Sequence, residues 1–239
     1  MSSVDASKIF RVDDLVAVIT GGGSGIGLMM TKALALNGAH KVYIIGRRLE
    51  VLEEATKESP HGNIIPIVGD VTSKSSLEAV VKQIEGEVGY INVLIANSGI
   101  AGPQSKPQNT LKSIDEFRSE MWKLSFEEFT NTFHVNTTAV FFTTIAFLGL
   151  LDAGNKRKNV EQLSQVIATS SIAGFSRQPP GGYAYGLSKA ACTHLVKQLA
   201  TTLVPYDIRA NALAPGCKHR QHMSPRRSFS WLIMHSVSF

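Results

Sequence analysis

A glycine-rich turn near the start of the chain constrains the fold more than any other feature. The apolar, β-branched stretch 15–20 reads as a buried strand, and it runs directly into the sequence GGGSGIG, which opens a helical pattern over 27–36. Because glycines lack Cβ atoms, such a backbone can approach a ligand closely, and the positive end of the following helix favours a pyrophosphate. The alternative is a connection that binds nothing, which the flanking strand and helix disfavour. The candidate contact residues for a dinucleotide are Gly21, Ser24, Gly25, Ile26 and Gly27.

Strand-like and helix-like segments alternate along the rest of the chain, which is typical of βαβ units around a buried parallel sheet. The sequence therefore predicts an α/β fold with a single Rossmann-type, doubly wound parallel sheet. The expected strands are 15–20, 41–45, 64–68, 91–96, 165–169 and 208–213, and the expected helices are 27–36, 49–58, 74–87, 125–151 and 185–203. The polar, proline-containing stretch 102–122 interrupts this alternation and predicts a surface loop or a short extra helix.

The C-terminal residues 217–239 do not continue the pattern. They hold four of the five net positive charges of the chain (Lys218, Arg220, Arg226 and Arg227) and no acid. We expect one dinucleotide-binding domain over 1–216 and a poorly ordered basic tail over 217–239, with the last strand and helix of the fold missing or replaced. Since the rest of the chain is nearly neutral, a solvated end is a better explanation of this charge than a nucleic-acid site.

Other sequence features indicate a cytoplasmic protein. The first residues carry acids and no continuous apolar stretch, so we expect neither a signal sequence nor a membrane anchor. The longest apolar run, 139–151, is interrupted by threonines and predicts a buried helix. The two cysteines, Cys192 and Cys217, form neither a disulfide framework nor a metal-ligand cluster, so we expect a reducing compartment and no metal.

Two arginines indicate which dinucleotide binds. A site for NAD places an acid at the end of the second strand, where it accepts from the ribose 2′-OH. Here that place holds Arg47 and Arg48, and the first acid after the second strand is Glu50. Because guanidinium groups can hold a 2′-phosphate that a carboxylate would repel, we expect NADP(H) as the cofactor. The alternative is that both arginines only cap the loop and the next helix.

A tyrosine and a lysine four residues apart are the candidate proton-transfer pair. Tyr185 and Lys189 would share one face of a helix, because residues at this spacing are neighbours on a helical surface. A phenol is a poor acid or base at neutral pH, and a fixed cation beside it stabilises its ionised form. The nearby Tyr183 has no lysine four residues on, so the pair is Tyr185 and Lys189.

These motifs together resemble the short-chain dehydrogenase/reductase family, and the resemblance covers residues 15–216. The turn matches TGxxxGxG, the sequence at 96–99 is similar to NNAG, and Tyr185 to Lys189 matches YxxxK. The resemblance implies that Asp70 lies near the adenine, that Asn97 belongs to the cofactor site, and that Asn136 holds a water in a proton relay to Lys189. It further implies that Lys189 also holds the nicotinamide ribose, and that Ser171, with Ser170 as the second choice, bonds the substrate oxygen.

The function that this resemblance implies is an NADP(H)-dependent interconversion of a ketone and a secondary alcohol on a small molecule. The sequence is similar to fungal-type members that act on small secondary metabolites. The resemblance also implies a homo-oligomer formed through the fourth and fifth helices. It ends after Gly216, where the sequence looks like read-through from an altered splice junction or a frameshift. A dinucleotide-binding remnant without turnover, or a regulatory or interaction protein, is therefore the alternative.

Overall fold

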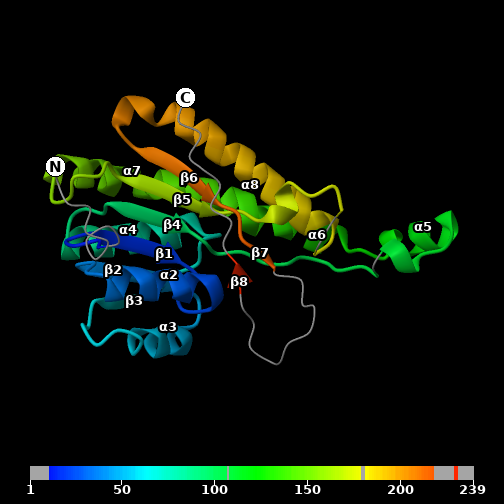
Figure 1. Cartoon of the computed structure of the whole chain (residues 1–239), viewed down its shortest axis with the longest axis horizontal. Helices are drawn as coiled ribbons and strands as arrows, with labels where there is room; N and C mark the ends of the chain where they lie inside the picture. Colours follow the sequence, from blue (N-terminus) through cyan, green and yellow to red (C-terminus); the bar gives the residue numbers. More distant parts are fainter. Residues whose placement is uncertain (1–10, 107, 179–180, 218–228, 231–239) are drawn as a thin grey trace, which may run out of the picture.

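A parallel sheet of six strands forms the centre of the protein in the computed structural model, which describes residues 11–106, 108–178, 181–217 and 229–230 (Figure 1). The strand order is β3-β2-β1-β4-β5-β6. The strands are β1 (Val16–Thr20), β2 (Lys41–Gly46), β3 (Ile64–Val68), β4 (Val93–Ala96), β5 (Gln165–Thr169) and β6 (Arg209–Leu213). All six predicted strands are present, so the predicted α/β, doubly wound fold is confirmed.

Helices cover the two faces of the sheet unequally. On one face, α2 (Gly25–Leu36) and α3 (Leu49–Thr56) pack on β1, β2 and β3. On the other face, α4 (Lys74–Glu87), α7 (Ala139–Arg157) and α8 (Tyr183–Thr202) enclose the larger core. The helices that pack on β5 and β6, α7 and α8, lie on this second face. On the opposite side Ile167 and Leu213 are only partly buried.

The predicted helix over 125–151 is wrong in one respect, because it is interrupted. The structure has α6 (Phe126–Phe133), then a π-helical turn, η2 (His134–Thr138), and then α7. Ser125 caps α6 by accepting a hydrogen bond from the backbone N–H of Glu128. Taken together, α6, η2 and α7 (Phe126–Arg157) are long and apolar enough for a membrane span. Side chains such as Phe147 and Leu151 are buried, however, as in a core helix of a soluble protein.

The stretch 102–122, predicted as a loop or a short extra helix, contains a short 3-10 turn, η1 (Gln108–Thr110), and a helix, α5 (Ile114–Trp122). Figure 1 shows that α5 stands away from the body of the molecule on an arm. None of its side chains is buried. Two further 3-10 turns, η3 (Ile172–Gly174) and η4 (Val204–Tyr206), flank α8.

The chain after β6 forms a short antiparallel pair between β7 (Gly216–Cys217) and β8 (Phe229–Ser230). This pair was not expected from the sequence. Among the described residues β6 is an edge of the parallel sheet, in agreement with the expected lack of a further parallel strand. The predicted poor order of the tail falls on 218–228 and 231–239, which lie outside the described residues.

Candidate active site

The glycine turn between β1 and α2 is built on close backbone contact. Gly21 and Gly25 have positive φ values of 67° and 54°, in the left-handed region that favours glycine. A Cβ on Gly27 would collide with the carbonyl oxygen of Gly21 and lie 2.6 Å from Nδ2 of Asn97. Ser24 occupies the N-cap of α2, yet its exposed hydroxyl makes no capping hydrogen bond. The turn therefore presents free backbone and hydroxyl donors at the positive end of a helix.

Asn97 ties together the carboxyl ends of three strands. Its side-chain amide donates to the carbonyl oxygen of Thr20 at 3.1 Å, and its Oδ1 accepts from the hydroxyl of Thr169 at 3.1 Å. The hydroxyl of Thr20 in turn accepts from the backbone N–H groups of Asn97 and Ser98. The side chain of Asn97 is thus committed to the protein, and it fixes the position of the sheet edge on which a cofactor would lie.

The side chains expected around the adenosine half lie on the carboxyl side of β2 and β3. Arg47 and Arg48 are both exposed, and Arg48 is the N-cap residue of α3. The carboxylate of Asp70 accepts from the backbone N–H and the hydroxyl of Thr72, at 2.9 and 2.6 Å. These hydrogen bonds, and then the charge of Arg47, lower the pKa of Asp70. Asp70 is therefore held in place by Thr72, in a setting that favours its ionised form.

Tyr185 and Lys189 are brought together in the first turns of α8. The Nζ atom of Lys189 lies 6.0 Å from the centre of the Tyr185 ring. Lys189 is only 4% exposed, and its ammonium donates to the carbonyl oxygen of Thr169 at 2.6 Å. Burial lowers the pKa of Lys189, and none of the ion pairs among the described residues includes it. The predicted adjacency of phenol and ammonium is present, beside the end of β5.

The two serines after β5 have different surroundings. Ser170 donates to the carbonyl oxygen of Lys189 at 3.0 Å and shares a 2.6 Å hydrogen bond with the hydroxyl of Thr193, so it joins the loop to α8. Ser171 caps η3 by accepting from the backbone N–H of Ala173 at 3.2 Å. Its hydroxyl hydrogen is left available as a donor. Of the two serines, Ser171 has the free donor that bonding a substrate oxygen requires.

Asn136 lies in the π-helical turn and is fully buried. Its Oδ1 accepts from the backbone N–H of Ile100 at 2.8 Å, and its Nδ2 donates to the Ile100 carbonyl oxygen at 2.9 Å and to Oγ of Ser188 at 3.0 Å. A Cβ on Gly99 would lie 3.0 Å from Oδ1 of Asn136 and 3.4 Å from Nζ of Lys189. Gly99 therefore keeps the space between these two side chains open.

Sequence reasoning did not single out Ser188 or Thr169, although both bond predicted site residues. Ser188 stands inside the YxxxK motif, where any residue is allowed, and Thr169 contributes a backbone carbonyl that no side-chain pattern reveals. Neither carries a local signal in the sequence. Only the packing of η2 and β5 against α8 assigns them their contacts.

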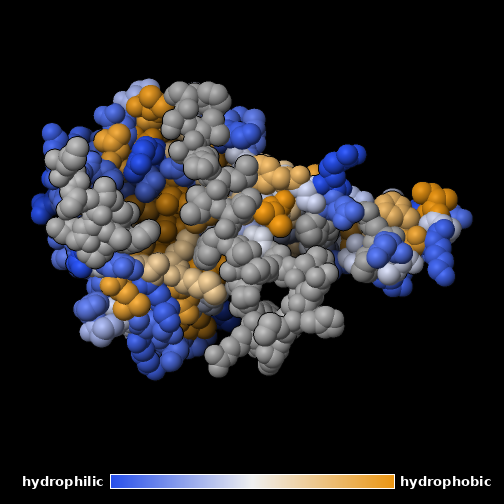
Figure 2. Space-filling view, in the orientation of Figure 1, coloured by the Kyte–Doolittle hydropathy of each residue, from blue (hydrophilic) through white to orange (hydrophobic). Residues whose placement is uncertain are grey.

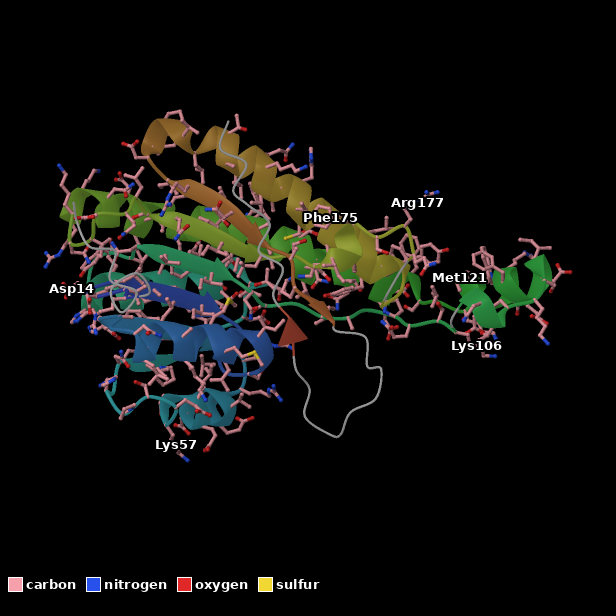
Figure 3. All side chains as sticks on the ribbon, in the orientation of Figure 1. Asp14, Lys57, Lys106, Met121, Phe175 and Arg177 are labelled. Carbon is pink, nitrogen blue, oxygen red and sulfur yellow. The ribbon has the colours of Figure 1, made fainter. Side chains whose placement is uncertain are left out.

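Two loops meet near the start of α8. The side-chain amide of Gln104, at the base of the arm, donates to the carbonyl oxygens of Gly102 and Gly181 at 3.1 and 2.9 Å. Figure 3 shows Phe175 and Arg177 on the segment before α8, and Met121 on the arm. The base of the arm is thereby joined to the loop that leads into α8.

An apolar groove of about 510 Å³ lies where the arm meets α6 and α8. Figure 2 shows apolar surface along this arm. The side chains that line the groove are Phe117, Met121, Leu124, Ser125, Phe126, Phe129, Tyr183 and Leu187. The groove contains Tyr183 and Leu187 of α8 but none of the predicted catalytic residues.

The described residues fit a nicotinamide dinucleotide. The turn at 21–27 is closed to any Cβ at Gly27, its Ser24 hydroxyl is uncommitted, and a buried ammonium, Lys189, stands at the same edge of the sheet. The structure shows no group of three or more His, Cys, Asp or Glu side chains that could hold a metal ion within the residues it describes.

A parallel, doubly wound sheet with this turn after its first strand defines the class of dinucleotide-binding α/β proteins. The model of the family described as short chain dehydrogenase matches residues 15–229. This chain belongs to the short-chain dehydrogenase family.

Known relatives agree with that assignment. The chain is 54% identical over 215 residues to short-chain dehydrogenase/reductase PhomF of Diaporthe leptostromiformis, covering 90% of this chain and 73% of the relative. It is 46% identical over 235 residues to VdtF of Byssochlamys spectabilis, covering 90% and 76%. Its structure is similar to the NADP complex of RhlG from Pseudomonas aeruginosa (TM-score 0.73, 28% identity, 87% and 75% covered). It is also similar to an NAD+-bound xylitol dehydrogenase (TM-score 0.71, 27% identity, 85% and 70% covered).

Proposed function

We propose that this protein is an NADP(H)-dependent oxidoreductase that interconverts a ketone and a secondary alcohol on a small molecule, a secondary metabolite by its sequence resemblance. The observation that carries the proposal is the pairing of Tyr185 with the buried ammonium of Lys189 at the sheet edge that also holds the glycine turn. We assign the active domain to 1–216 and the compartment to the cytoplasm.

The side chains of the site have separate roles in the proposed reaction. Tyr185 passes a proton to or from the substrate oxygen, and the hydroxyl of Ser171 donates to that oxygen and polarises it. Lys189 would stabilise the ionised phenol and hold the ribose hydroxyls. Asn136 would hold a water in a proton relay to Lys189, and its side chain bonds both backbone groups of Ile100, just past the end of β4. The bound nicotinamide supplies or accepts the hydride.

The preference for NADP(H) rests on Arg47 and Arg48. Both guanidinium groups are exposed at the end of β2, where a 2′-phosphate would lie, and the charge of Arg47 reaches Asp70. Similar structures include one complex with NADP and one with NAD+, so the comparisons leave this choice to the chain's own residues. Gly21, Ser24, Gly25, Ile26 and Gly27 would hold the pyrophosphate, with Asp70 and Asn97 toward the adenosine.

We also propose that the protein forms a homo-oligomer through α6–α7 and α8, the fourth and fifth helices of the sequence prediction. Large apolar side chains on these helices are exposed to solvent: Phe126, Phe141, Ile145 and Leu187. Burying such side chains between two copies would stabilise an assembly. Sedimentation velocity of the wild-type protein tests this proposal, and a monomer at all concentrations up to about 100 μM contradicts it.

The decisive experiment for the proposed reaction compares Tyr185→Phe with Tyr183→Phe. Wild-type protein is assayed with NADPH against a panel of ketones, and NADPH affinity is measured by fluorescence. We expect Tyr185→Phe to lose at least about a hundredfold in kcat and to keep its NADPH affinity, because only the proton-passing oxygen is removed. Tyr183→Phe should retain turnover.

Each other outcome has a definite meaning. Retention of more than a few per cent of turnover by Tyr185→Phe removes this residue from its proposed role. A wild-type protein that binds NADPH and reduces no ketone is instead a dinucleotide-binding protein without turnover. A wild-type protein that binds no nicotinamide dinucleotide overturns the proposal as a whole.

A further inference from the structure

Ser188 receives hydrogen bonds from two consecutive residues of the π-helical turn η2. The side-chain amide of Asn136 donates to its Oγ at 3.0 Å, and the hydroxyl of Thr137 donates to its carbonyl oxygen at 2.9 Å. The Oγ of Ser188 in turn donates to the carbonyl oxygen of Tyr185 at 2.8 Å. Ser188 is fully buried, so water cannot replace these partners.

Two adjacent residues of one π-helical turn bond the same residue of α8. The turn η2 occupies His134–Thr138 and directs both Asn136 and Thr137 at α8. Such turns are frequent at functional sites.

The two residues that donate to Ser188 differ in the other hydrogen bonds that they make. Asn136 also holds both backbone groups of Ile100, just past the end of β4, so the path Ile100, Asn136, Ser188 joins the sheet edge to α8. The hydroxyl of Thr137, in contrast, is seen to bond only the backbone carbonyl oxygen of Ser188 in α8. Of these two hydrogen bonds to Ser188, only the one from Asn136 also leads to the end of β4.

We propose that Ser188 is a positioning residue, which sets the distance between the end of β4 and the Tyr185 and Lys189 pair through Asn136. This inference rests on the proposed function, because hydride and proton must reach the same carbonyl group from these two sides. A misplacement of about 1 Å can reduce a reaction rate about a hundredfold. Ser188 needs no contact with substrate to have this effect.

The matched test variants are Ser188→Ala and Thr137→Val. Ser188→Ala removes one of the two acceptors of the Asn136 side-chain amide, and Thr137→Val removes the other hydrogen bond to Ser188 at nearly constant volume. We expect Ser188→Ala to lower kcat at least about tenfold with NADPH affinity within about twofold of wild type. Thr137→Val should keep kcat within about threefold.

A second measurement does not depend on turnover. Hydrogen exchange of the Ile100 amide reports how firmly Asn136 holds it, with the Val18 amide of β1 as a reference for global stability. Relative to Val18, we expect exchange at Ile100 at least about fivefold faster in Ser188→Ala and unchanged in Thr137→Val.

The outcomes separate the two proposals. If wild-type protein shows no turnover, the proposed function fails and the exchange comparison alone decides the role of Ser188. If both variants, or neither, change exchange at Ile100, Ser188 is an ordinary buried serine and the inference is wrong. If one variant changes kcat and the other changes hydrogen exchange at Ile100, the proposed path through Asn136 is also wrong. Where Ser188→Ala does not fold, Ser188→Cys keeps a weak donor and acceptor and takes its place, with the expected changes smaller in size.

Discussion

Lys189 is the residue at which folding and the proposed chemistry make opposite demands. Its ammonium is buried and bonded to the carbonyl oxygen of Thr169, and burial lowers its pKa because a low-dielectric interior disfavours the charged form. A neutral side chain of similar length would avoid this cost. The proposed proton transfer needs the charge, so the residue is retained against the stability of the fold.

Replacing Lys189 with Met should therefore raise stability and abolish turnover. Between the lowered folded-state pKa and the ordinary value of 10.5, the unfolded chain binds more protons than the folded chain. The free energy of unfolding of wild-type protein consequently rises with pH across that window, and this rise disappears in the variant. Denaturant titrations from pH 7 to about 10 measure it, with the exposed Lys197→Met on the same helix as the control. Equal pH slopes in wild type and Lys189→Met would contradict the argument.

Arg47 is the residue on which the cofactor preference depends. Arg47→Asp should lower the ratio of the Kd for NADH to the Kd for NADPH at least tenfold, about 1.4 kcal/mol, because a carboxylate repels a 2′-phosphate and can accept from a 2′-OH. Arg118→Asp, on the exposed arm, is the control for a general loss of positive charge. If the ratio stays constant even when Arg47 and Arg48 are both changed to Asp, NADP(H) is not the preferred cofactor.

At the scale of secondary structure, the glycine turn is the element that the sequence predicted best. The succession of strand, glycines and helix is a local pattern, and the structure places Gly21, Gly25 and Gly27 in one close turn. The interruption of the fourth helix could not be predicted in the same way. The stretch 125–151 contains no proline that would mark an interruption, and η2 is held by contacts of Asn136 with Ile100 and Ser188, which are distant in sequence.

A pair of glycine substitutions tests the close packing of the turn. Gly27→Ala forces a methyl group against the Gly21 carbonyl oxygen and the Asn97 side chain, so we expect a loss of about 2 kcal/mol in stability and weaker dinucleotide binding. Gly149 lies inside α7 with open space around it, so Gly149→Ala should raise stability by up to about 1 kcal/mol. Thermal unfolding of both variants measures the difference. A Gly27→Ala protein as stable as wild type would show that the turn can widen without cost.

At the scale of the whole molecule, the order of strands and helices along the chain predicted the class of fold. It did not predict how helices cover the two faces of the sheet. Alternating strands and helices imply a parallel sheet with helices on both sides, and right-handed crossovers then fix the side of each helix. The sequence gives no local sign that β5 and β6 lack a described helix on one face, where Ile167 and Leu213 are partly buried.

A protease should cut the chain in the arm that carries α5, and the two fragments should stay associated. No side chain of α5 is buried, and Lys112, Arg118 and Lys123 are all exposed, so trypsin should cleave there before anywhere in the sheet. The two fragments would carry β1 to β4 and β5 to β6 of one continuous sheet. We expect them to co-elute in gel filtration and to separate only in denaturant, since the hydrogen bonds between β4 and β5 survive the cut. A nicked protein of this kind would allow the halves to be expressed, labelled and recombined separately.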